Sequence, residues 1–512
     1  MNNYIKVFKK VVMLAGFIAV LLAISTPSAE GQWNGSGSYN NPYEIHSVAD
    51  LNLLASNVNA GNSYSNTHFK LMSDIPTFTQ MIGNDVNFFA GHFNGNNKKI
   101  TVNINENDTN VGLFSKVDGW ATIENLIVDG SVVGGYGSQY VGGLVGEAIS
   151  GNIDFCTNLA DVTGLAINSS VAGISGAANT QTNFMGCINN GTITGGQYVA
   201  GIMGKSNTTL NVIKGCKNSG TIKGNQNRPL LSYIAGIIAF AYAQEIYDNT
   251  NIGKIMSNDF CYAGGIVACL IDGRVTYCHN SGIIDGATYS IGGIVGYLNN
   301  SSISRCLNTN WVDSGIARYY GSIVGNNGIV DSCYYDNQMS AIGGINNVDI
   351  PLQAEGLPTD NIIGFTLINL LSGPWVFANN LYPRIITYDP DHPIELLAAA
   401  PIYLQNNPIT GDPERLDYVT QDFYVSNYNT YPPFLPPNLL LPQFYYQWGW
   451  YNPNYIPFSA NGFIEMLQPN IASIRMRLGW DSLAVRLINY NYPPYSNYNI
   501  VFEKIVPINV RR

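Results

Sequence analysis

Residues 289–306 read YSIGGIVGYLNNSSISRC and place three glycines within five residues, beside Ile294 and Val295. A segment of this kind suits either a loop that cradles phosphate or the corner of a structural coil. A phosphate-binding loop occurs once in a chain, between a strand and a helix. What surrounds the segment therefore decides between the two roles.

The six-residue unit IGGIVG recurs through the middle of the chain, and we call it the glycine motif. Its copies are VGGLVG (141–146), VAGISG (171–176), VAGIMG (199–204), IAGIIA (234–239), AGGIVA (263–268), IGGIVG (291–296) and YGSIVG (320–325), after a degenerate VGLF (111–114). The third position of the full copies is Gly143, Gly173, Gly201, Gly236, Gly265 and Gly293, with Ser322 in the last. A phosphate loop is thereby excluded.

A second landmark, Cys-any-Asn, follows each copy of the glycine motif at a nearly constant distance. Its copies are CTNLADV (156–162), CINNGTI (187–193), CKNSGTI (216–222), CHNSGII (278–284) and CLNTNWV (306–312), with Asn249 in place of Cys in NTNIGKI (249–255). An apolar residue precedes each landmark by three positions: Ile153, Phe184, Ile213, Ile246, Val275, Ile303 and Val330. Two landmarks in register indicate stacked repeats.

A period of about 29 residues, built from short β-rich runs and Gly/Asn corners, predicts an all-β, right-handed parallel β-solenoid. Helical repeats are excluded because no window shows a 3.6-residue period. About eight coils spaced like paired strands give a rod on the order of 40 Å long. Strand alternation places position four in the core, position five outward or half-covered, and positions two and six on the face of position four. The predicted core residues are Leu144, Ile174, Ile202, Ile237, Ile266, Ile294 and Ile323.

Six of the eight cysteines share one repeat position and are expected to form a buried ladder of free thiols: Cys156, Cys187, Cys216, Cys278, Cys306 and Cys333. Disulfides would be the usual expectation for an exported chain. In-register side chains, however, point in the same direction rather than at one another. Cys261 and Cys269 lie off register, and the strand between them keeps them too far apart to pair.

The remaining regions define the expected domain organisation. Residues 1–29 are predicted to be a signal peptide, because a basic start precedes a short apolar run and small residues. Residues 30–110 form an N-terminal cap and first coil, in which Ser47 and Asp50 resemble a capping box. Residues 111–344 are the repeats, 345–388 cap the far end, and 389–512 are expected to form an immunoglobulin-like β-sandwich of about seven strands.

With these motifs, the sequence resembles the GLUG-motif repeat proteins of bacterial surfaces, named for a Gly-Leu-any-Gly core seen here as GLVG (143–146). The resemblance covers about residues 33–388. It includes a lead-in (35–75), a first coil (89–102) and a closing segment, GPWVFANNLYPRI (373–385). It implies a β-solenoid on an exported protein. A looser resemblance relates 389–512 to the domain that follows such repeats in some members.

The residues offer little for catalysis, and we expect no cofactor and no metal. Similar repeats occur in some immunoglobulin-A-specific metallopeptidases, but the five histidines include no His-Glu-any-any-His pair. His279 is expected to be an exposed neighbour of a buried cysteine. The acidic residues of the repeats do not recur at one position and read as turn residues, and a net charge of −10 excludes a nucleic-acid partner. Trp448 and Trp450 are candidate ligand contacts, although they also fit a sandwich core.

The sequence therefore predicts a non-catalytic, exported cell-surface protein that does not span the membrane after signal cleavage. Its solenoid would act as an adhesin-like binding rod or spacer, with host or matrix glycans or proteins as partners. The alternative is a β-helix protein that binds or processes carbohydrate.

Overall fold

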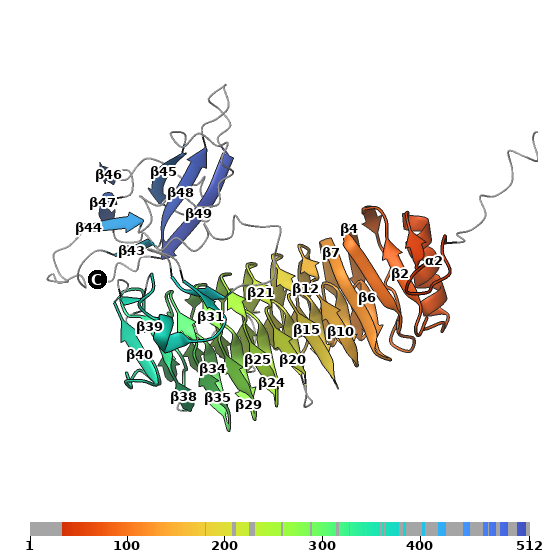
Figure 1. Cartoon of the computed structure of the whole chain (residues 1–512), viewed down its shortest axis with the longest axis horizontal. Coiled ribbons are helices and arrows are strands. Elements are labelled where there is room, and N and C mark those ends of the chain that lie inside the picture. The colour runs from red at the N-terminus through yellow and green to blue at the C-terminus, as the bar shows by residue number, and fades with distance from the viewer. Residues whose placement is uncertain are drawn as a thin grey trace, which may run out of the picture.

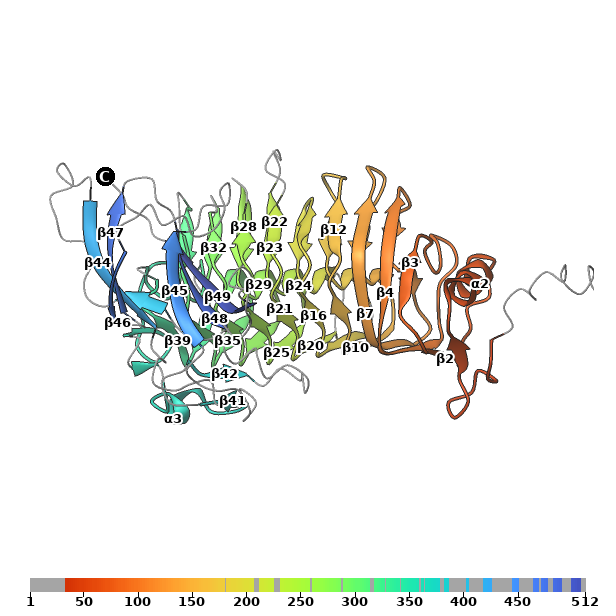
Figure 2. The same cartoon turned by 90° about the horizontal axis from the view of Figure 1, so that it is seen from above.

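The structure, a computed structural model, forms a parallel β-solenoid of about nine turns, one more than the sequence predicts. It describes residues 33–385, apart from 180, 207–210, 225–230, 258–259, 287–288, 314–316, 327, 341, 359–360, 363 and 378–381, together with the backbone of seven strands beyond residue 401. The turns stack in chain order along the long axis, as two perpendicular views show (Figures 1 and 2). The all-β solenoid is confirmed, and its right-handed winding stays a prediction.

Each central turn contains five short strands, and equivalent strands of successive turns pair in parallel to form three sheets. Sheet 1 leads into the glycine motif: β5 (Asn110–Val111), β8 (Tyr140–Gly142), β13 (Ser170–Ala172), β18 (Tyr198–Ala200), β23 (Ser232–Ala235), β28 (Cys261–Gly264), β33 (Ser290–Gly292) and β37 (Tyr319–Gly321). Sheet 2 leads away from it: β6 (Phe114–Val117), β9 (Val145–Ala148), β14 (Ser175–Ala178), β19 (Met203–Ser206), β24 (Ile238–Tyr242), β29 (Val267–Ile271) and β34 (Val295–Asn299).

Sheet 3 closes each turn and carries the Cys-any-Asn landmark. It begins with β1 (Tyr43–Ile45), β2 (His68–Leu71), β3 (Ile75–Phe78), β4 (His92–Glu106) and β7 (Ala121–Gly134). Its central strands are β10 (Gly151–Asp154), β11 (Thr157–Asn158), β12 (Asp161–Gly164), β15 (Thr182–Met185), β16 (Ile188–Asn189), β17 (Ile193–Gly195), β20 (Val212–Lys214), β21 (Lys217–Asn218), β22 (Ile222–Gly224), β25 (Glu245–Tyr247), β26 (Thr250–Asn251), β27 (Ile255–Met256), β30 (Arg274–Thr276), β31 (His279–Asn280) and β32 (Ile284–Asp285). It ends with β35 (Ser302–Ser304), β36 (Leu307–Asn308), β38 (Ile329–Asp331), β39 (Cys333–Asp336) and β40 (Ala354–Leu357).

One continuous apolar core runs through the stack from Ile45 to Ala354. The residue three places before each landmark pairs in register from turn to turn, so that Ile153 lies beside Phe184 and Phe184 beside Ile213. The seven side chains at position four of the motif are all fully buried: Leu144, Ile174, Ile202, Ile237, Ile266, Ile294 and Ile323. Each turn is therefore stabilised by burial against its neighbours rather than within itself.

The glycine motif forms a bend, and this changes which way its other positions point. Strand β8 ends at position two and β9 begins at position five, so alternation does not continue through positions three and four. Position five is fully buried in every turn, from Val145 to Val324, and the expectation that it is outward or half-covered was wrong. Position two also differs from the expectation. Val141 points into the core, so Gly142 points outward, where a Cβ would lie 1.9 Å from the carbonyl oxygen of Val145.

A ladder of six buried asparagines runs along the inside of this bend. They are the Asn residues of the landmark: Asn158, Asn189, Asn218, Asn251, Asn280 and Asn308. Each of the first five donates from Nδ2 to Oδ1 of the next, over 2.8–2.9 Å. Each of the six also donates to the backbone carbonyl two residues further on, over 2.8–3.1 Å. The side-chain amides thus bond along the stack and to their own turns.

The central glycine of the motif packs directly against this ladder. A Cβ on Gly201 would lie 2.6 Å from Oδ1 of Asn218 and 2.3 Å from the carbonyl oxygen of Gly236 in the next turn. The two turns without a ladder asparagine lack this glycine. In the first turn, Val128 occupies the ladder position, and the motif copy at 111–114 is one residue shorter and has no third-position residue. In the last turn, Tyr335 occupies the ladder position, and Ser322 replaces the glycine.

A second corner lies just before each landmark. The residue preceding the Cys position has a φ between 51° and 64° in seven turns: Phe155, Gly186, Gly215, Asp248, Tyr277, Arg305 and Ser332. This left-handed conformation turns the first strand of sheet 3 into the second. Glycine adopts it freely, whereas the other side chains accept a cost of about 1 kcal/mol that the stacked neighbours impose.

The N-terminal end is covered by helix α2 (Val48–Asn59). Ser47 and Asp50 form the expected reciprocal capping box, which is confirmed, with Oδ2 of Asp50 accepting from the backbone N–H of Ser47 over 3.0 Å. Leu51, Leu54 and Val58 are buried in the same core as the first turns. The helix therefore shields the open end of the solenoid, which would otherwise offer a bare edge.

The C-terminal segment is arranged differently from the expected end cap. Strand β40 forms a further rung of sheet 3. Beyond it, helix α3 (Ile368–Leu371), β41 (Trp375–Val376) and β42 (Arg384–Ile385) lie against the side of the last turns. Their apolar side chains pack on sheet 3 in a separate cluster: Leu307, Tyr334, Ile362, Leu367, Leu371, Trp375, Tyr382 and Ile385. The described residues between 361 and 385 thus form a side cover rather than a plug.

Seven strands follow beyond residue 401, the number expected for the C-terminal region. Four form an antiparallel sheet in the order β43 (Ile402–Leu404), β44 (Tyr418–Val425), β47 (Ile471–Arg477) and β46 (Ile464–Gln468). Three form a second antiparallel sheet in the order β45 (Phe444–Trp450), β48 (Ser482–Asn489) and β49 (Asn499–Pro507). The immunoglobulin-like assignment stays a prediction.

Replacing a central ladder asparagine is expected to destabilise the solenoid strongly. Asn218→Ala leaves one amide proton of Asn189 and Oδ1 of Asn251 buried without their ladder partner. At about 1–3 kcal/mol for each of the two orphaned groups, the loss is about 2–6 kcal/mol. Urea unfolding followed by circular dichroism measures it.

The matched control is Asn152→Ala on the outer surface of sheet 3. Asn152 also accepts an amide bond from the next turn, over 3.1 Å from Asn183, but the pair is only half-buried. This change is expected to cost about 1 kcal/mol or less. Equal unfolding midpoints for the two variants would refute a structural role for the ladder.

Candidate functional site

A row of tyrosines precedes the glycine motif, at a place that we call position zero. Because position one points into the core, position zero points outward. Successive turns place these residues in register: Asn110, Tyr140, Ser170, Tyr198, Tyr233, Tyr262, Ser290 and Tyr319. All five tyrosine side chains are half-buried, so part of each ring reaches solvent.

A second row lies across the bend, at position seven, the first residue after the motif. Its members pair in register along sheet 2: Lys116, Glu147, Ala177, Lys205, Phe240, Cys269 and Tyr297. The two rows touch. The ring centroids of Tyr262 and Tyr297 are 4.9 Å apart in a stacked arrangement, and those of Tyr233 and Phe240 are 5.5 Å apart. Outward side chains of two sheets can meet only where the surface is concave.

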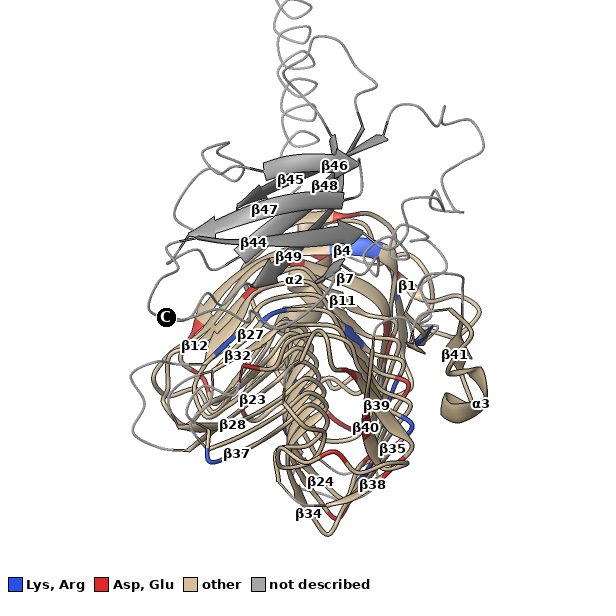
Figure 3. Ribbon diagram, turned by 90° about the vertical axis from the view of Figure 1, so that its left-hand side faces the viewer, with Lys and Arg blue, Asp and Glu red and all other residues tan. Residues whose placement is uncertain are grey.

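We call the two rows, from Tyr140 to Tyr319, the aromatic groove. Viewed along the axis, β28 and β37 of sheet 1 lie beside β24 and β34 of sheet 2, and the ribbon there is mostly uncharged (Figure 3). The seven rungs of the row extend over roughly 30 Å at the spacing of paired strands. Rings also stack along the row, with the centroids of Tyr198 and Tyr233 4.9 Å apart at an angle of 10°.

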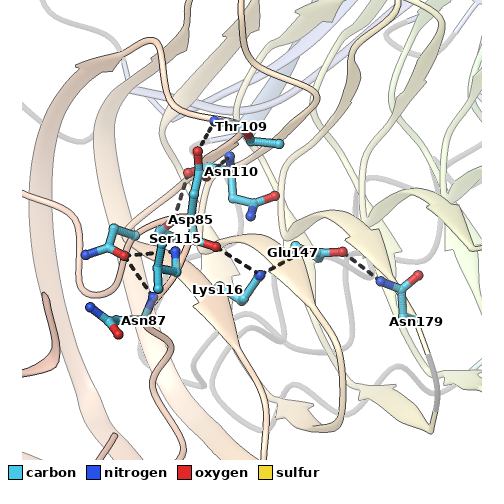
Figure 4. Close-up of polar contacts among 10 residues, drawn as sticks. Asp85, Asn87, Thr109, Asn110, Ser115, Lys116, Glu147 and Asn179 are labelled. Carbon is cyan, nitrogen blue, oxygen red and sulfur yellow. Dashed lines mark hydrogen bonds and ion pairs between the residues drawn. The ribbon is translucent and has the colours of Figure 1, made fainter. Parts of the chain in front are cut away.

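The N-terminal end of the groove is closed by a polar network (Figure 4). Nζ of Lys116 lies 3.7 Å from the carboxylate of Glu147 and donates to the carbonyl oxygen of Asp85 over 3.3 Å. The same carboxylate of Glu147 accepts from Nδ2 of Asn179 over 2.8 Å. The carboxylate of Asp85 accepts from the backbone N–H of Thr109 and from that of the following residue. The charge of Lys116 is therefore compensated by Glu147, and the carboxylate of Asp85 is bonded by backbone N–H groups.

The groove widens into a pocket between Tyr140 and Tyr198. The rung between them carries only the small residues Ser170 and Ala177. The pocket has a volume of about 550 Å³ and is also lined by residues of two loops, including Ile167 and Gln197. Nζ of Lys205 lies over both tyrosine rings, 5.3 Å from each centroid. At that distance an ammonium group is attracted to the face of an aromatic ring.

Burial tunes the ionisable groups of the groove. Desolvation lowers the pKa of Lys205, against the opposing attraction of Glu147. Desolvation raises the pKa of Tyr140, and Glu147 adds to the effect. The pKa of Tyr262 is raised by desolvation and by neighbouring Tyr289. The phenols of Tyr140 and Tyr262 therefore stay protonated well above neutral pH and keep an O–H group that can donate a hydrogen bond.

The cysteines lie in the core, away from the groove rows except for Cys269. All eight are free and buried, including the six at the repeat position: Cys156, Cys187, Cys216, Cys278, Cys306 and Cys333. The backbone N–H of Cys278 donates to Sγ of Cys306 over 3.4 Å, and Cys306 is bonded to Cys333 in the same way. Asn249 occupies the cysteine position in the one turn whose landmark has no cysteine, and its Oδ1 accepts from the backbone N–H of Cys216.

The buried thiols are expected to be unreactive in the folded protein. Burial raises the pKa of Cys269 to about 12 and the pKa of Cys156 further. The thiolate fraction at pH 8 is therefore far below that of a free cysteine. An Ellman assay at pH 8 should detect none of the eight thiols in native protein and all eight after unfolding without reductant. Three or four disulfides in the unfolded sample would contradict a thiol ladder.

Trp448 and Trp450 lie in β45, whose side chains are outside the described part of the chain, so their role as ligand contacts stays a prediction.

His279 was expected to be exposed and is instead buried. Its Nε2 is 2.9 Å from Oγ1 of Thr309, and its ring faces Trp375 at 5.9 Å. The side cover of residues 361–385, which the sequence did not place, explains the difference.

One pair of carboxylates lies on the outer face of sheet 3. Glu124 and Asp154 are neighbours on adjacent strands, and Oε1 of Glu124 also accepts from Nδ2 of Asn94 over 2.6 Å. Burial, and then the charge of Glu124, raise the pKa of Asp154 to about 6. In the described ranges no cluster of three or more His, Cys, Asp or Glu residues could hold a metal ion.

Asp154 makes stability depend on pH. The folded state binds its proton up to about pH 6, whereas the unfolded chain releases it near pH 3.8. Stability therefore falls as pH rises from about 4 to about 6. Asp154→Asn should remove this fall and stabilise the protein at pH 7, by about 1–2 kcal/mol after allowance for solvent screening.

Urea midpoints at pH 4 and pH 7 test this expectation, with Asp161→Asn, an exposed carboxylate of β12, as the control. An equal pH dependence in wild type and Asp154→Asn would contradict it.

Sequence reasoning missed both the asparagine ladder and the aromatic groove. The ladder had a signal, since Asn follows each landmark cysteine by two residues in the repeats. The groove had one too, since five motif copies are preceded by Tyr. No sequence signal indicates that positions zero and seven lie side by side, because their contact depends on the bend.

No family model matches the chain. A stretch of 161 residues is 30% identical to a protein of Evansella cellulosilytica described as "Putative Gly-rich membrane protein". The match covers 28% of this chain and 18% of that protein, so the chain spans less than a fifth of its relative.

A solved structure from Bacteroides ovatus, described as a "putative immunoglobulin A1 protease", is 16% identical and has a TM-score of 0.35. The alignment covers 69% of this chain and 95% of that one. A likeness with so low a TM-score supports no conclusion about the function of this chain.

Neither helix within the described residues is long and apolar enough to span a membrane.

Proposed function

We propose that the chain is a non-catalytic, exported surface protein whose solenoid is a rigid rod that binds ligands along the aromatic groove. The groove itself is the observation that carries this proposal. Half-exposed tyrosine rings in register along a concave surface serve no packing need of the core, which is complete without them. Tyrosine is also a residue type that dominates binding surfaces.

Rigidity follows from the way the turns are joined. A single core, in-register sheets and the asparagine ladder bond each turn to both neighbours. Contacts along such a rod hold fixed spacings, so many weak contacts with a repetitive ligand add without the entropic cost of ordering the protein.

Export and display rest on the sequence. Residues 1–29 have the pattern of a signal peptide, the repeats resemble GLUG proteins of bacterial surfaces, and 389–512 are proposed to be an immunoglobulin-like domain. The boundaries at 30–110, 111–344 and 345–388 are kept as the proposed organisation, with the last segment including the side cover. The Evansella relative is described as a membrane protein, which agrees with a place at the cell surface.

The groove favours binding over cleavage. Glycoside hydrolysis requires a pair of carboxyl groups flanking the scissile bond. Glu147 is the one acidic residue of the two described groove rows, and it is paired with Lys116. A spacer without ligand is the remaining alternative, and it gives the tyrosine rows no role.

Removing the central rings should weaken adhesion without affecting display. We expect bacteria that produce Tyr198→Ala/Tyr233→Ala/Tyr262→Ala to adhere to matrix-coated wells about tenfold less than wild type, because three aromatic contacts are lost. Antibody labelling of intact cells measures display. Tyr247→Ala is the matched control, since Tyr247 is a half-buried tyrosine under Lys214, at 5.2 Å, on the outer face of sheet 3.

Wild-type adhesion by the triple variant would favour the spacer. Labelling only after permeabilisation would disprove surface display.

A further inference from the structure

We infer that the aromatic groove is a row of subsites for a linear, uncharged polysaccharide, whose sugar rings pack on the exposed parts of the tyrosine side chains. The inference rests on the proposed binding function and names its ligand class. It also assigns the pocket at Tyr140, Tyr198 and Lys205 as the subsite that fixes the position of the chain.

The shape of the groove matches a ligand that is itself repetitive. Tyr198, Tyr233 and Tyr262 present one ring on each of three consecutive rungs, and Phe240 and Tyr297 face them from sheet 2. The groove is long and open rather than a deep apolar socket of the kind that anchors a protein hot spot. A pyranose ring has one face made of C–H bonds, which an aromatic face covers without desolvating the hydroxyl groups at the ring edge.

The polar groups of the groove are placed for those hydroxyls. Phenolic O–H groups lie at the edge of each ring, and the raised pKa values of Tyr140 and Tyr262 keep them as donors. Gln197 and Lys205 add amide and ammonium groups at the pocket. Such a surface pairs an apolar face with a polar rim, as a sugar does.

Charge argues against an anionic ligand. Lys116 is compensated by Glu147 at one end of the groove. The rungs of Tyr233 and Tyr262 present uncharged side chains in both rows. Lys205 is the other cation of the two described rows, and the whole chain is acidic at −10. A polyanion would meet little attraction and a net repulsion.

The pocket breaks the regular row and so can set the register of the ligand. Ser170 and Ala177 leave a gap between Tyr140 and Tyr198, which lie on either side of their rung. Two steps of paired strands separate these rings by roughly 10 Å. Lys205 spans the gap and contacts both rings. A sugar that enters the pocket meets Tyr140, Tyr198 and the ammonium group of Lys205 together, whereas sugars on the other rungs meet the row at one ring each.

Affinity electrophoresis of the mature full-length chain tests the inference. Native gels would contain laminarin, xylan, mannan or pullulan as neutral probes and hyaluronan as an anionic one. We expect retardation by at least one neutral polysaccharide and none by hyaluronan. Tyr198→Ala should weaken that retardation about tenfold and Tyr198→Phe much less, because the ring provides most of the contact.

Tyr247→Ala should behave as wild type, and circular dichroism should show all variants folded. Retardation unchanged in Tyr198→Ala and in Tyr262→Ala would overturn the inference, as would preference for hyaluronan.

Failure of this inference can be told apart from failure of the proposed function. If no polysaccharide binds but adhesion still depends on the groove tyrosines, the ligand class is wrong and the binding rod stands. Proline-rich peptides also dock on aromatic grooves. Binding of a peptide with the sequence PPFLPP, as in residues 432–437, together with no binding of glycans, would replace the sugar by a peptide. If groove variants alter no binding of any kind, both proposals fail.

Discussion

The structure depends on one steric and hydrogen-bonded constraint, the contact between the buried asparagine ladder and the glycine at the centre of the bend. A buried side-chain amide must be bonded, or it costs more than a similar apolar group. Here each of the first five amides donates twice, once to its own turn and once to the next. That arrangement needs the bend backbone to approach so closely that a Cβ at Gly201 would collide with Asn218. The glycine and the asparagine therefore occur together, and both are missing in the turns immediately before and after the ladder.

The same constraint creates the surface on which function is proposed. Because the chain bends over the ladder, sheets 1 and 2 meet at an inward angle and their outward residues face each other. Tyr233 and Phe240 are separated by the whole motif in sequence, yet their ring centroids lie 5.5 Å apart. The contact between ladder asparagine and central glycine inside each turn thus determines where the aromatic residues lie outside it. Repetition of the turn extends that aromatic surface along the rod.

Much of the fold was accessible from the sequence, because two landmarks in register impose stacking whatever their detailed geometry. Burial of Ile294 and its equivalents, the buried position of Cys278 and the capping box at Ser47 follow from local pattern and repeat register alone. The orientations of Val145 and Gly142 did not follow, since strand alternation says nothing about a bend within the motif. The burial of His279 depends on residues 361–385 folding back along the side, a tertiary contact with no periodic signal. The groove could not be predicted either, because it too depends on the bend within the motif.

Hydrogen exchange of the asparagine side-chain amides tests the central claim most directly. In protein labelled with ¹⁵N at asparagine, the ladder amides, identified by their loss or shift in Asn218→Ala, should exchange as slowly as backbone amides in the core strands. Amides on the outer surface, such as that of Asn183, should exchange far faster. Fast exchange of every asparagine side chain in the folded protein would contradict a buried, doubly bonded ladder, and with it this explanation of the bend and of the groove.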